Sequence, residues 1–323
     1  MVSHELRPEV VVLGEALIDL VDGGDSPYQA HAGGGPYNVA IGLARLGVRT
    51  GLLARLSTDP FGMLLREHAE RSHVDLSAAV VTDQPTTVAL VRLRDGAATY
   101  HFQVDGTANF GWTDAELDAV AVGHSIVHFG SLVSWTPPGS GPVHRFVARL
   151  RDRGDVLVSY DPNVRPLLQS DPDRARADVE SAVGVAHLVK ASADDLAWLY
   201  PGAAAADVAA RWLAAGPALV VITLADRGSV AFRPTGAPVA RPIRPGPAVV
   251  DTIGAGDAFI SGLLRGLCRR GVAGPADLPG IAGSADTIGA LLDEASTVAA
   301  VACSRPGANP PWRDEVGFDR TGG

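Results

Sequence analysis

The sequence has few cysteines and lacks the patterns that build disulfide frameworks, metal clusters and membrane spans. Its two cysteines, Cys268 and Cys303, lie in apolar stretches with a helical pattern, so we expect buried thiols there. Its nine histidines show no metal-ligand spacing. No apolar run approaches the roughly 20 residues that span a bilayer, and the N-terminal residues carry no apolar signal region. We therefore expect a soluble cytoplasmic protein with no membrane partner.

The balance of charge excludes another class of partner. A net charge of -9 argues against a general nucleic-acid binder, although it allows an anionic ligand in a local pocket. Among 27 basic residues, Lys190 is the only lysine. This lysine has either survived by chance, or its position needs a compact ammonium that the planar guanidinium of arginine cannot replace.

Short apolar runs followed by helical periodicity indicate an α/β domain with a mostly parallel sheet. We expect one domain over residues 1–323, with hydrophobic residues making up 46% of the chain. No G-x-G-x-x-G follows the first apolar run, so the usual dinucleotide-binding fold is disfavoured. The expected buried strands cover residues 10–13, 52–56, 126–129, 156–158, 188–190 and 219–224.

One pair of segments breaks the strand and helix rhythm. Residues 86–94 and 98–105 alternate between apolar and polar positions around Asp95-Gly96, which predicts a hairpin. Such antiparallel strands would form a small β-sheet lid, together with residues 20–32, or an edge hairpin without function. An exposed sheet can pair with a second copy, so we also expect a homodimer.

The stretch from Asp251 to Phe259 combines two glycines, an acid and the start of a helix. Free N–H groups at Gly254, Ala255 and Gly256 would form a site for a phosphate or an oxyanion. Asp257 inside such a site could accept a proton during phosphoryl transfer, or it could only interact with the helix dipole. The local pattern leaves both interpretations open.

Polar side chains also follow other expected strands. Asp19 comes shortly after the first strand, and three glycines at residues 33–35 precede Asn38 at the start of a helix. Residues 161, 163 and 165 are Asp, Asn and Arg, which would face one side together in a strand-like path.

Two of these motifs together resemble the signatures of the ribokinase-like sugar kinases, the PfkB family. The first is Gly33-Gly34-Gly35-x-x-Asn38, and the second is Asp251-Thr252-x-Gly254-Ala255-Gly256-Asp257. The likeness covers nearly the whole chain. It implies a three-layer ribokinase-like (Rossmann-like) α/β domain with a small β-sheet lid, and ATP-dependent phosphorylation of a primary hydroxyl of a small sugar.

The resemblance also implies residue roles. Asp257 would be the base, and the backbone of Gly254, Ala255 and Gly256 would hold the transferred phosphoryl group. Substrate contacts are expected at Asp19, Gly33, Gly34, Asn38 and Arg165, and nucleotide contacts at Lys190, Ser192, Thr223, Gly228 and Asn309. The implied cofactors are ATP and Mg²⁺, with Asp195 acting on the magnesium through water, and K⁺ is expected near Asp251.

The chain departs from the family pattern at two places. Ser192-x-x-Asp195 replaces the usual Asn-x-x-Glu, so the direct transfer of a metal role is open. Ala225 stands where many relatives have glycine, which costs little unless the position needs a positive φ.

The segments Gly14 to Asp19, Gly106 to Ala108 and His128 to Ser131 look most like fructokinase-type members. A nucleoside or ribose kinase of the same fold is the alternative, with Tyr37 and Tyr100 as aromatic candidates together with Phe102. An inactive sugar- or nucleotide-binding regulator is the alternative from another class.

Overall fold

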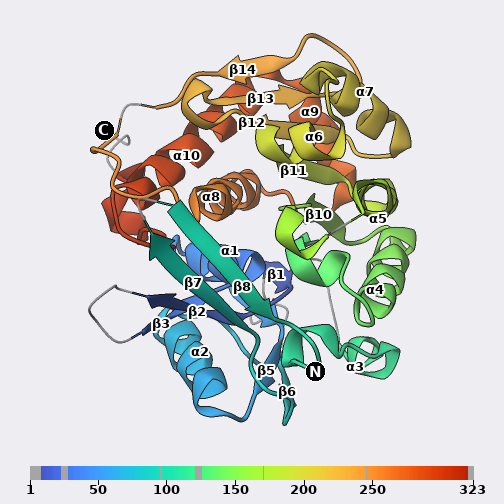
Figure 1. Cartoon of the computed structure of the whole chain (residues 1–323). Helices are drawn as coiled ribbons and strands as arrows, with labels where there is room; N and C mark the ends of the chain where they lie inside the picture. Colours follow the sequence, from blue (N-terminus) through green and yellow to red (C-terminus); the bar gives the residue numbers. More distant parts are fainter. Residues whose placement is uncertain are drawn as a thin grey trace.

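The computed structural model describes residues 9–22, 28–94, 97–120, 126–169, 171–244 and 246–318, without the side chains of residues 92–100. In this part of the chain an eight-stranded sheet forms the centre, in the order β14-β13-β12-β11-β10-β9-β1-β4 (Figure 1). Its parallel strands are β1 (Val10–Leu13), β4 (Thr50–Leu53), β9 (Ile126–Gly130), β10 (Leu157–Asp161), β11 (Leu188–Ser192) and β12 (Leu219–Thr223). The antiparallel strands β13 (Ser229–Phe232) and β14 (Val239–Arg241) complete one edge.

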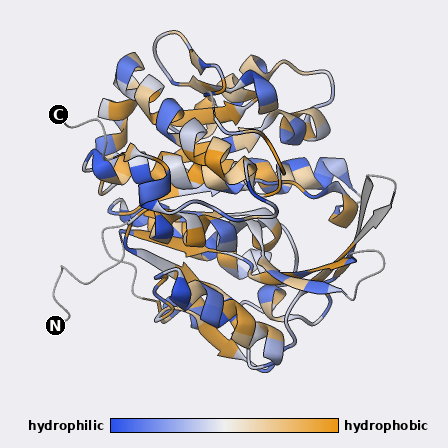
Figure 2. Cartoon of the chain, turned by 90° about the vertical axis from the view of Figure 1, so that its left-hand side faces the viewer, coloured by the Kyte–Doolittle hydropathy of each residue, from blue (hydrophilic) through white to orange (hydrophobic). Residues whose placement is uncertain are grey.

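Helices cover both faces of this sheet, because its parallel strands are apolar on both sides. One hydrophobic core joins the sheet to α1 (Gly35–Arg45), α2 (Pro60–Arg71), α8 (Ala255–Arg269), α9 (Leu278–Gly283) and α10 (Ala285–Cys303). The other joins it to α3 (Asp114–Asp118), α4 (Ser140–Arg153), α5 (Pro172–Val185), α6 (Ala193–Leu199) and α7 (Ala205–Ala215). Hydrophobic residues accordingly concentrate in the central strands and the inner faces of the helices (Figure 2). The predicted three-layer α/β arrangement is confirmed.

A smaller mixed sheet lies beside the helices at one end of the central sheet (Figure 1). Its order is β3-β2-β7-β8, formed by β2 (Leu17–Asp22), β3 (Gln29–Gly33), β7 (Val88–Arg94) and β8 (Ala97–Gln103). The predicted hairpin strands therefore exist and pair in antiparallel fashion, from Val88 with Gln103 to Arg94 with Ala97. The hairpin turn at Asp95-Gly96, and residues 23–27 of the expected lid, lie outside the described residues.

Two details differ from the sequence prediction. The single strand expected over residues 52–56 is two strands, because the chain leaves the central sheet at Ala54, and β5 (Arg55–Ser57) pairs with β6 (Val80–Thr82). The Arg55 side chain then reaches Gln84 and the carbonyl of Ala108, at 2.6 and 3.1 Å. The two cysteines are half-buried rather than buried.

Among the described residues, no helix is long and apolar enough to cross a bilayer.

Candidate active site

A cavity of about 1260 Å³ opens where the parallel strands of the central sheet end. Its walls combine residues that are far apart in the sequence, including Asp19 of β2, Asn38 of α1, Lys190 of β11, Thr223 of β12 and Asp257 of α8. The carboxyl ends of parallel strands are the usual place for a ligand in an open α/β sheet. The fold therefore brings most of the predicted site residues around one space.

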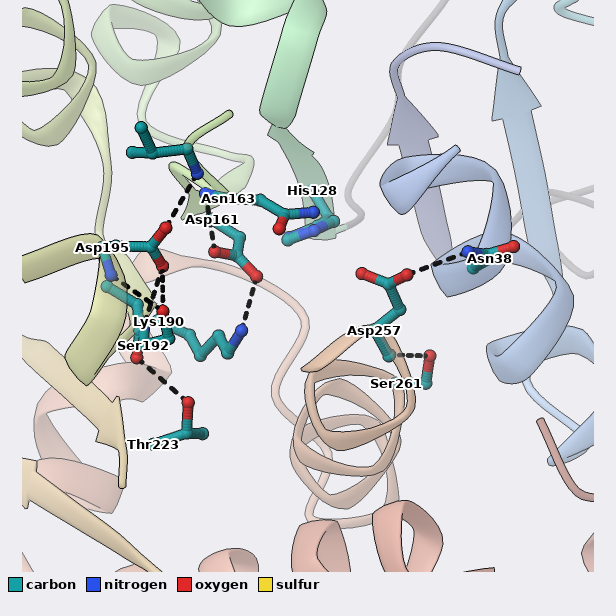
Figure 3. Close-up of polar contacts among 12 residues, drawn as sticks. Asn38, His128, Asp161, Asn163, Lys190, Ser192, Asp195, Thr223, Asp257 and Ser261 are labelled. Carbon is teal, nitrogen blue, oxygen red and sulfur yellow. Dashed lines mark hydrogen bonds and ion pairs between the residues drawn. The ribbon is translucent and has the colours of Figure 1, made fainter. Parts of the chain in front are cut away.

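Asp257 lies in the first turn of α8 and is buried. Helix α8 begins after Gly254, whose φ is 75°, and no side chain caps it. Asp257 Oδ2 instead accepts a hydrogen bond from Asn38 Nδ2 at 2.9 Å (Figure 3). The carboxylate is therefore aimed across the cavity toward α1 and does not act as the cap of its own helix.

The electrostatic surroundings of Asp257 favour a proton acceptor. Burial raises the pKa of Asp257 to about 6, although the hydrogen bond from Asn38 and the positive charges of Lys190 and Arg165 act in the opposite direction. A carboxylate with a pKa near 6 is ionised at neutral pH and is a stronger base than an ordinary aspartate.

The Gly254 to Gly256 turn carries the first N–H groups of α8, which have no acceptor within the helix. A Cβ on Gly254 would lie 2.9 Å from Ala308 Cβ, so only glycine fits there. A Cβ on Gly256 would lie 3.0 Å from Lys190 Nζ, which places the ammonium group next to this turn. Backbone N–H groups and an ammonium group together form a site suited to an anion.

Lys190, the only lysine of the chain, is held as a buried ammonium group. Its Nζ lies 2.8 Å from Asp161 Oδ2, and both side chains are buried (Figure 3). Burial alone would lower the pKa of Lys190, but the charges of Asp161, Asp195 and Asp257 outweigh it, so the pKa is raised. The branched guanidinium of arginine is bulkier than this ammonium, and Gly256 leaves little space beside it.

The path from Asp161 to Arg165 is not strand-like, so the prediction that their side chains face one side together is wrong. Strand β10 ends at Asp161, and Asn163 has a φ of 39°. Asparagine is enriched in this left-handed region because its short polar side chain tolerates it. Asp161 turns toward Lys190, whereas Asn163 and Arg165 line the cavity and are joined at 2.6 Å by Nη1 and Oδ1.

The three consecutive glycines allow three different groups to approach the chain. A Cβ on Gly33 would lie 2.4 Å from Asp19 Oδ2, and one on Gly34 would lie 2.7 Å from the carbonyl oxygen of Glu15. A Cβ on Gly35 would lie 2.5 Å from Asn163 Nδ2. Gly34 also has a φ of 108°, which disfavours other residues.

Glu15 is a site residue that the sequence analysis did not assign. It is buried, lines the cavity and has its Oε2 atom without a hydrogen-bond partner among the described residues. Burial raises the pKa of Glu15 to about 7 and that of Asp19 to about 6, against the opposing charge of Arg165. The sequence signal that could have identified Glu15 is its position beside Gly14, directly after the first strand.

Ser192 and Asp195 form a capping box at the start of α6. Asp195 Oδ2 accepts from the N–H and hydroxyl of Ser192 at 2.8 and 2.6 Å, and Oδ1 accepts from the N–H of Val164 at 2.8 Å. Both oxygens therefore hold protein groups, and Asp195 anchors the loop that carries Asn163 and Arg165. In the described residues, no cluster of three or more His, Cys, Asp or Glu side chains could hold a metal.

This donor set fits Mg²⁺ bound through its water shell. Asp194 and Asp195 both line the cavity near Lys190 and Thr223. Magnesium usually keeps several waters and takes one or two carboxylates together with the phosphates of its nucleotide, so a complete protein cage is not needed.

The expected nucleotide residues separate into two groups. Thr223 and Gly228 line the cavity, and Gly228 is required because its φ is 92° and a Cβ there would lie 2.1 Å from the carbonyl oxygen of Arg241. Asn309 is not among the residues that line the cavity: its Oδ1 accepts from Arg45 Nη1 at 2.7 Å. Asp251 is also outside the lining, and its Oδ2 accepts from the N–H of Gly307 at 2.8 Å.

Comparisons with known proteins agree with this geometry. The family model described as pfkB family carbohydrate kinase matches residues 7–315. A fructokinase from Rhizobium leguminosarum bv. trifolii is 34% identical over 265 residues, which cover 80% of this chain and 79% of that protein.

Two solved structures extend the comparison. The structure of a fructokinase with bound ATP from Xylella fastidiosa matches with a TM-score of 0.84 and 26% identity, covering 96% of this chain and 97% of that chain. The aminoimidazole riboside kinase from Salmonella enterica, complexed with its riboside and an ATP analogue, matches with a TM-score of 0.80 and 25% identity, covering 95% and 98%.

Ala225 provides a test of backbone strain at the nucleotide end of the cavity. Its φ is 52°, a region that costs a non-glycine residue about 1 kcal/mol or more. We expect Ala225→Gly to raise the free energy of unfolding by up to about 1 kcal/mol, after the entropy cost of glycine.

Chemical denaturation would measure this change, with Ala203→Gly as the control. Ala203 is exposed and is not among the residues with a positive φ, so glycine there should lower stability by about 0.5 kcal/mol. Equal losses at the two positions would contradict the expected strain.

Proposed function

Because this chain belongs to the pfkB family of carbohydrate kinases, we propose that it is a fructokinase, which transfers the γ-phosphoryl group of ATP to a primary hydroxyl of fructose. The coarser prediction, an ATP-dependent sugar kinase with a ribokinase-like fold, is confirmed. The intact Asp257 and the glycines at 254 and 256 favour an enzyme over the inactive regulator, which needs no acid beside an anion site. The observation that carries the proposed chemistry is Asp257, held by Asn38 in the first turn of α8, directly after the Gly254 to Gly256 turn.

In the proposed reaction the carboxylate of Asp257 takes the proton of the sugar hydroxyl. The hydroxyl oxygen forms a bond to the γ-phosphorus of ATP, and the bond between this phosphorus and the β,γ-bridging oxygen breaks to release ADP. The N–H groups at Gly254, Ala255 and Gly256 hold the phosphoryl oxygens, and Lys190 adds a fixed positive charge beside them. When bound, Mg²⁺ supplies charge neutralisation on the nucleotide phosphates.

Other roles follow as parts of the same proposal. Asp19, Gly33, Gly34, Asn38 and Arg165 position the sugar, while Ser192, Thr223 and Gly228 line the nucleotide path. Asp195 acts on Mg²⁺ through water, and Asp251 remains the candidate for a monovalent cation such as K⁺ because it fixes the loop at Gly307. A nucleotide contact by Asn309 is proposed from the sequence alone, because its side chain contacts Arg45 and does not line the cavity. Use of ATP fits an enzyme of the cytoplasm.

The small sheet is the proposed lid within a single kinase domain of residues 1–323. Phe102 of β8 lines the cavity opposite the central sheet, so movement of this sheet would change the access of water to the reacting groups. Within the described residues, β3 and β8 form the edges of this sheet, and a second copy pairing there would give the expected homodimer.

The charge at the sugar end supports an unphosphorylated substrate. Among the described residues that line this end, three carboxylates belong to Glu15, Asp19 and Asp257, and Arg165 supplies the opposing positive charge. A phosphate on the acceptor would approach these carboxylates, and such a meeting of like charges costs several kcal/mol.

We therefore expect kcat/KM for fructose to exceed that for fructose 6-phosphate by at least about 100-fold, because like charges repel in this end of the cavity. A coupled assay of ADP release with both sugars, ribose and a riboside would measure this preference. Higher kcat/KM for fructose 6-phosphate or the riboside would reject the fructokinase proposal.

Of the aromatic candidates for a nucleoside kinase, Phe102 lines the cavity. The Tyr37 hydroxyl donates to the carbonyl of Leu65, and the side chain of Tyr100 lies outside the described residues.

Replacement of the base is the direct test of the mechanism. Asp257→Asn keeps the shape and the contact with Asn38 but removes the proton acceptor, so we expect kcat to fall by about 10²–10⁴-fold with nucleotide affinity retained. Steady-state kinetics and nucleotide titration would measure the two effects. Asp173→Asn, at an exposed position of helix α5, is the matched control and should leave kcat unchanged. A variant at Asp257 with activity within about tenfold of wild type would remove this residue from the role of base.

The pH profile follows from the same group. Asp257 must be ionised to accept a proton, and its raised pKa of about 6 means that protonation begins well above the range of an ordinary aspartate. We expect kcat/KM to fall by about tenfold per pH unit below pH 6, and more steeply if Asp19 must also be ionised. A profile that stays flat down to pH 5 would contradict this assignment.

A further inference from the structure

A second cavity, of about 590 Å³, lies away from the reacting groups. Its walls come from the C-terminal half of α8, the middle of α10 and residues 316–318. Four arginines line it, at positions 244, 265, 269 and 270, together with Asp293 and Glu294. None of the residues proposed above for catalysis or substrate binding belongs to this wall.

Three of the four arginines in this cavity have a carboxylate within 4 Å. Arg270 lies 2.8 Å and Arg265 lies 3.8 Å from Glu294, and Arg244 lies 3.9 Å from Asp293. In the described part of the chain, exposed Arg269 contacts no carboxylate. Four arginines against two carboxylates leave this cavity with an excess of positive charge, although the chain as a whole has a net charge of -9.

The chemistry of the wall indicates the kind of ligand. Guanidinium groups bind phosphate through paired hydrogen bonds, more specifically than a point charge does. Val316 and Phe318 add apolar surface, and the Arg265 guanidinium stacks on the Phe318 ring at 4.0 Å. The volume falls within the range of small-molecule sites. We propose that this cavity is a second anion site, which binds a small phosphate-bearing molecule through Arg269 and its neighbouring arginines.

A structural explanation competes with this proposal. Arginines in the last turn of α8 also interact favourably with the negative end of the helix dipole, without any ligand. The two explanations differ in what they require, because the dipole needs only positive charge, whereas phosphate binding uses the planar fork. Arg269 therefore separates them, since Arg269→Lys keeps the charge and loses the fork.

The experiment must isolate this cavity from the catalytic one. Arg244 lines both cavities, so it is unsuitable as a test position. The catalytic cavity also binds phosphates under the proposed function, so it should first be filled with fructose and a non-hydrolysable ATP analogue. Orthophosphate and fructose 6-phosphate would then be titrated separately by calorimetry, which distinguishes free phosphate from a sugar phosphate as the ligand.

We expect saturable binding of at least one of the two anions to the wild-type enzyme. Arg269→Gln should weaken this binding by about tenfold or more, because it removes a charge-assisted contact. The affinity of Arg269→Lys should lie between those of the wild type and Arg269→Gln. Arg174→Gln, which removes the same charge from an exposed position of helix α5, should bind as wild type does. Equal melting temperatures of the variants without phosphate would show that folding is unchanged.

Two results would overturn the proposal. One is the absence of saturable binding for both anions up to about 10 mM. The other is equal affinity in Arg269→Gln and Arg174→Gln, which would leave the arginines as partners of the helix dipole. Both readings are independent of catalysis, so a wrong choice of sugar as substrate would appear in the kinetic assay and not here.

Discussion

The ion pair between Lys190 and Asp161 is the interaction on which the catalytic cavity depends. Both charges are buried and 2.8 Å apart, so removal of either would leave the other without compensation in a medium of low dielectric constant. The pair joins the last residue of β10 to the middle of the neighbouring strand β11. It thereby fixes the ammonium group next to Gly256, at the start of the helix that carries Asp257. One buried pair holds the sheet, the anion site and the base in a fixed relation.

The sequence predicted the parts of this arrangement that depend on local rules. The glycines at 34 and 254 stood out in the sequence and both have a positive φ, and helix α8 begins within the stretch from Asp251 to Phe259, as expected. Those local rules do not predict contacts between residues that are far apart in the sequence. The side chain of Asn309 points to Arg45, and Glu15 enters the cavity, because of packing between segments that the local pattern does not specify.

The departure at Ser192 and Asp195 shows how a local motif changes its meaning in the fold. From the sequence, the shorter acid left the metal role open. In the structure Asp195 holds the N–H groups of Ser192 and Val164, so it connects α6 to the loop of Asn163 and Arg165. A glutamate would place its carboxylate one methylene farther from the backbone of α6. The shorter acid thus fits a role in positioning the sugar-side loop, with magnesium reached through water.

The two ends of the catalytic cavity have opposite electrostatic character, and this difference orders the substrates. At the sugar end, buried carboxylates outnumber their one arginine, and burial raises their pKa because water is excluded. Around Gly256, backbone N–H groups and Lys190 favour negative charge. A polyphosphate is therefore repelled from one end and held at the other, while a neutral sugar pays no such penalty. Asp257 lies where the two ends meet, because it follows Gly256 directly and its carboxylate accepts a hydrogen bond from Asn38.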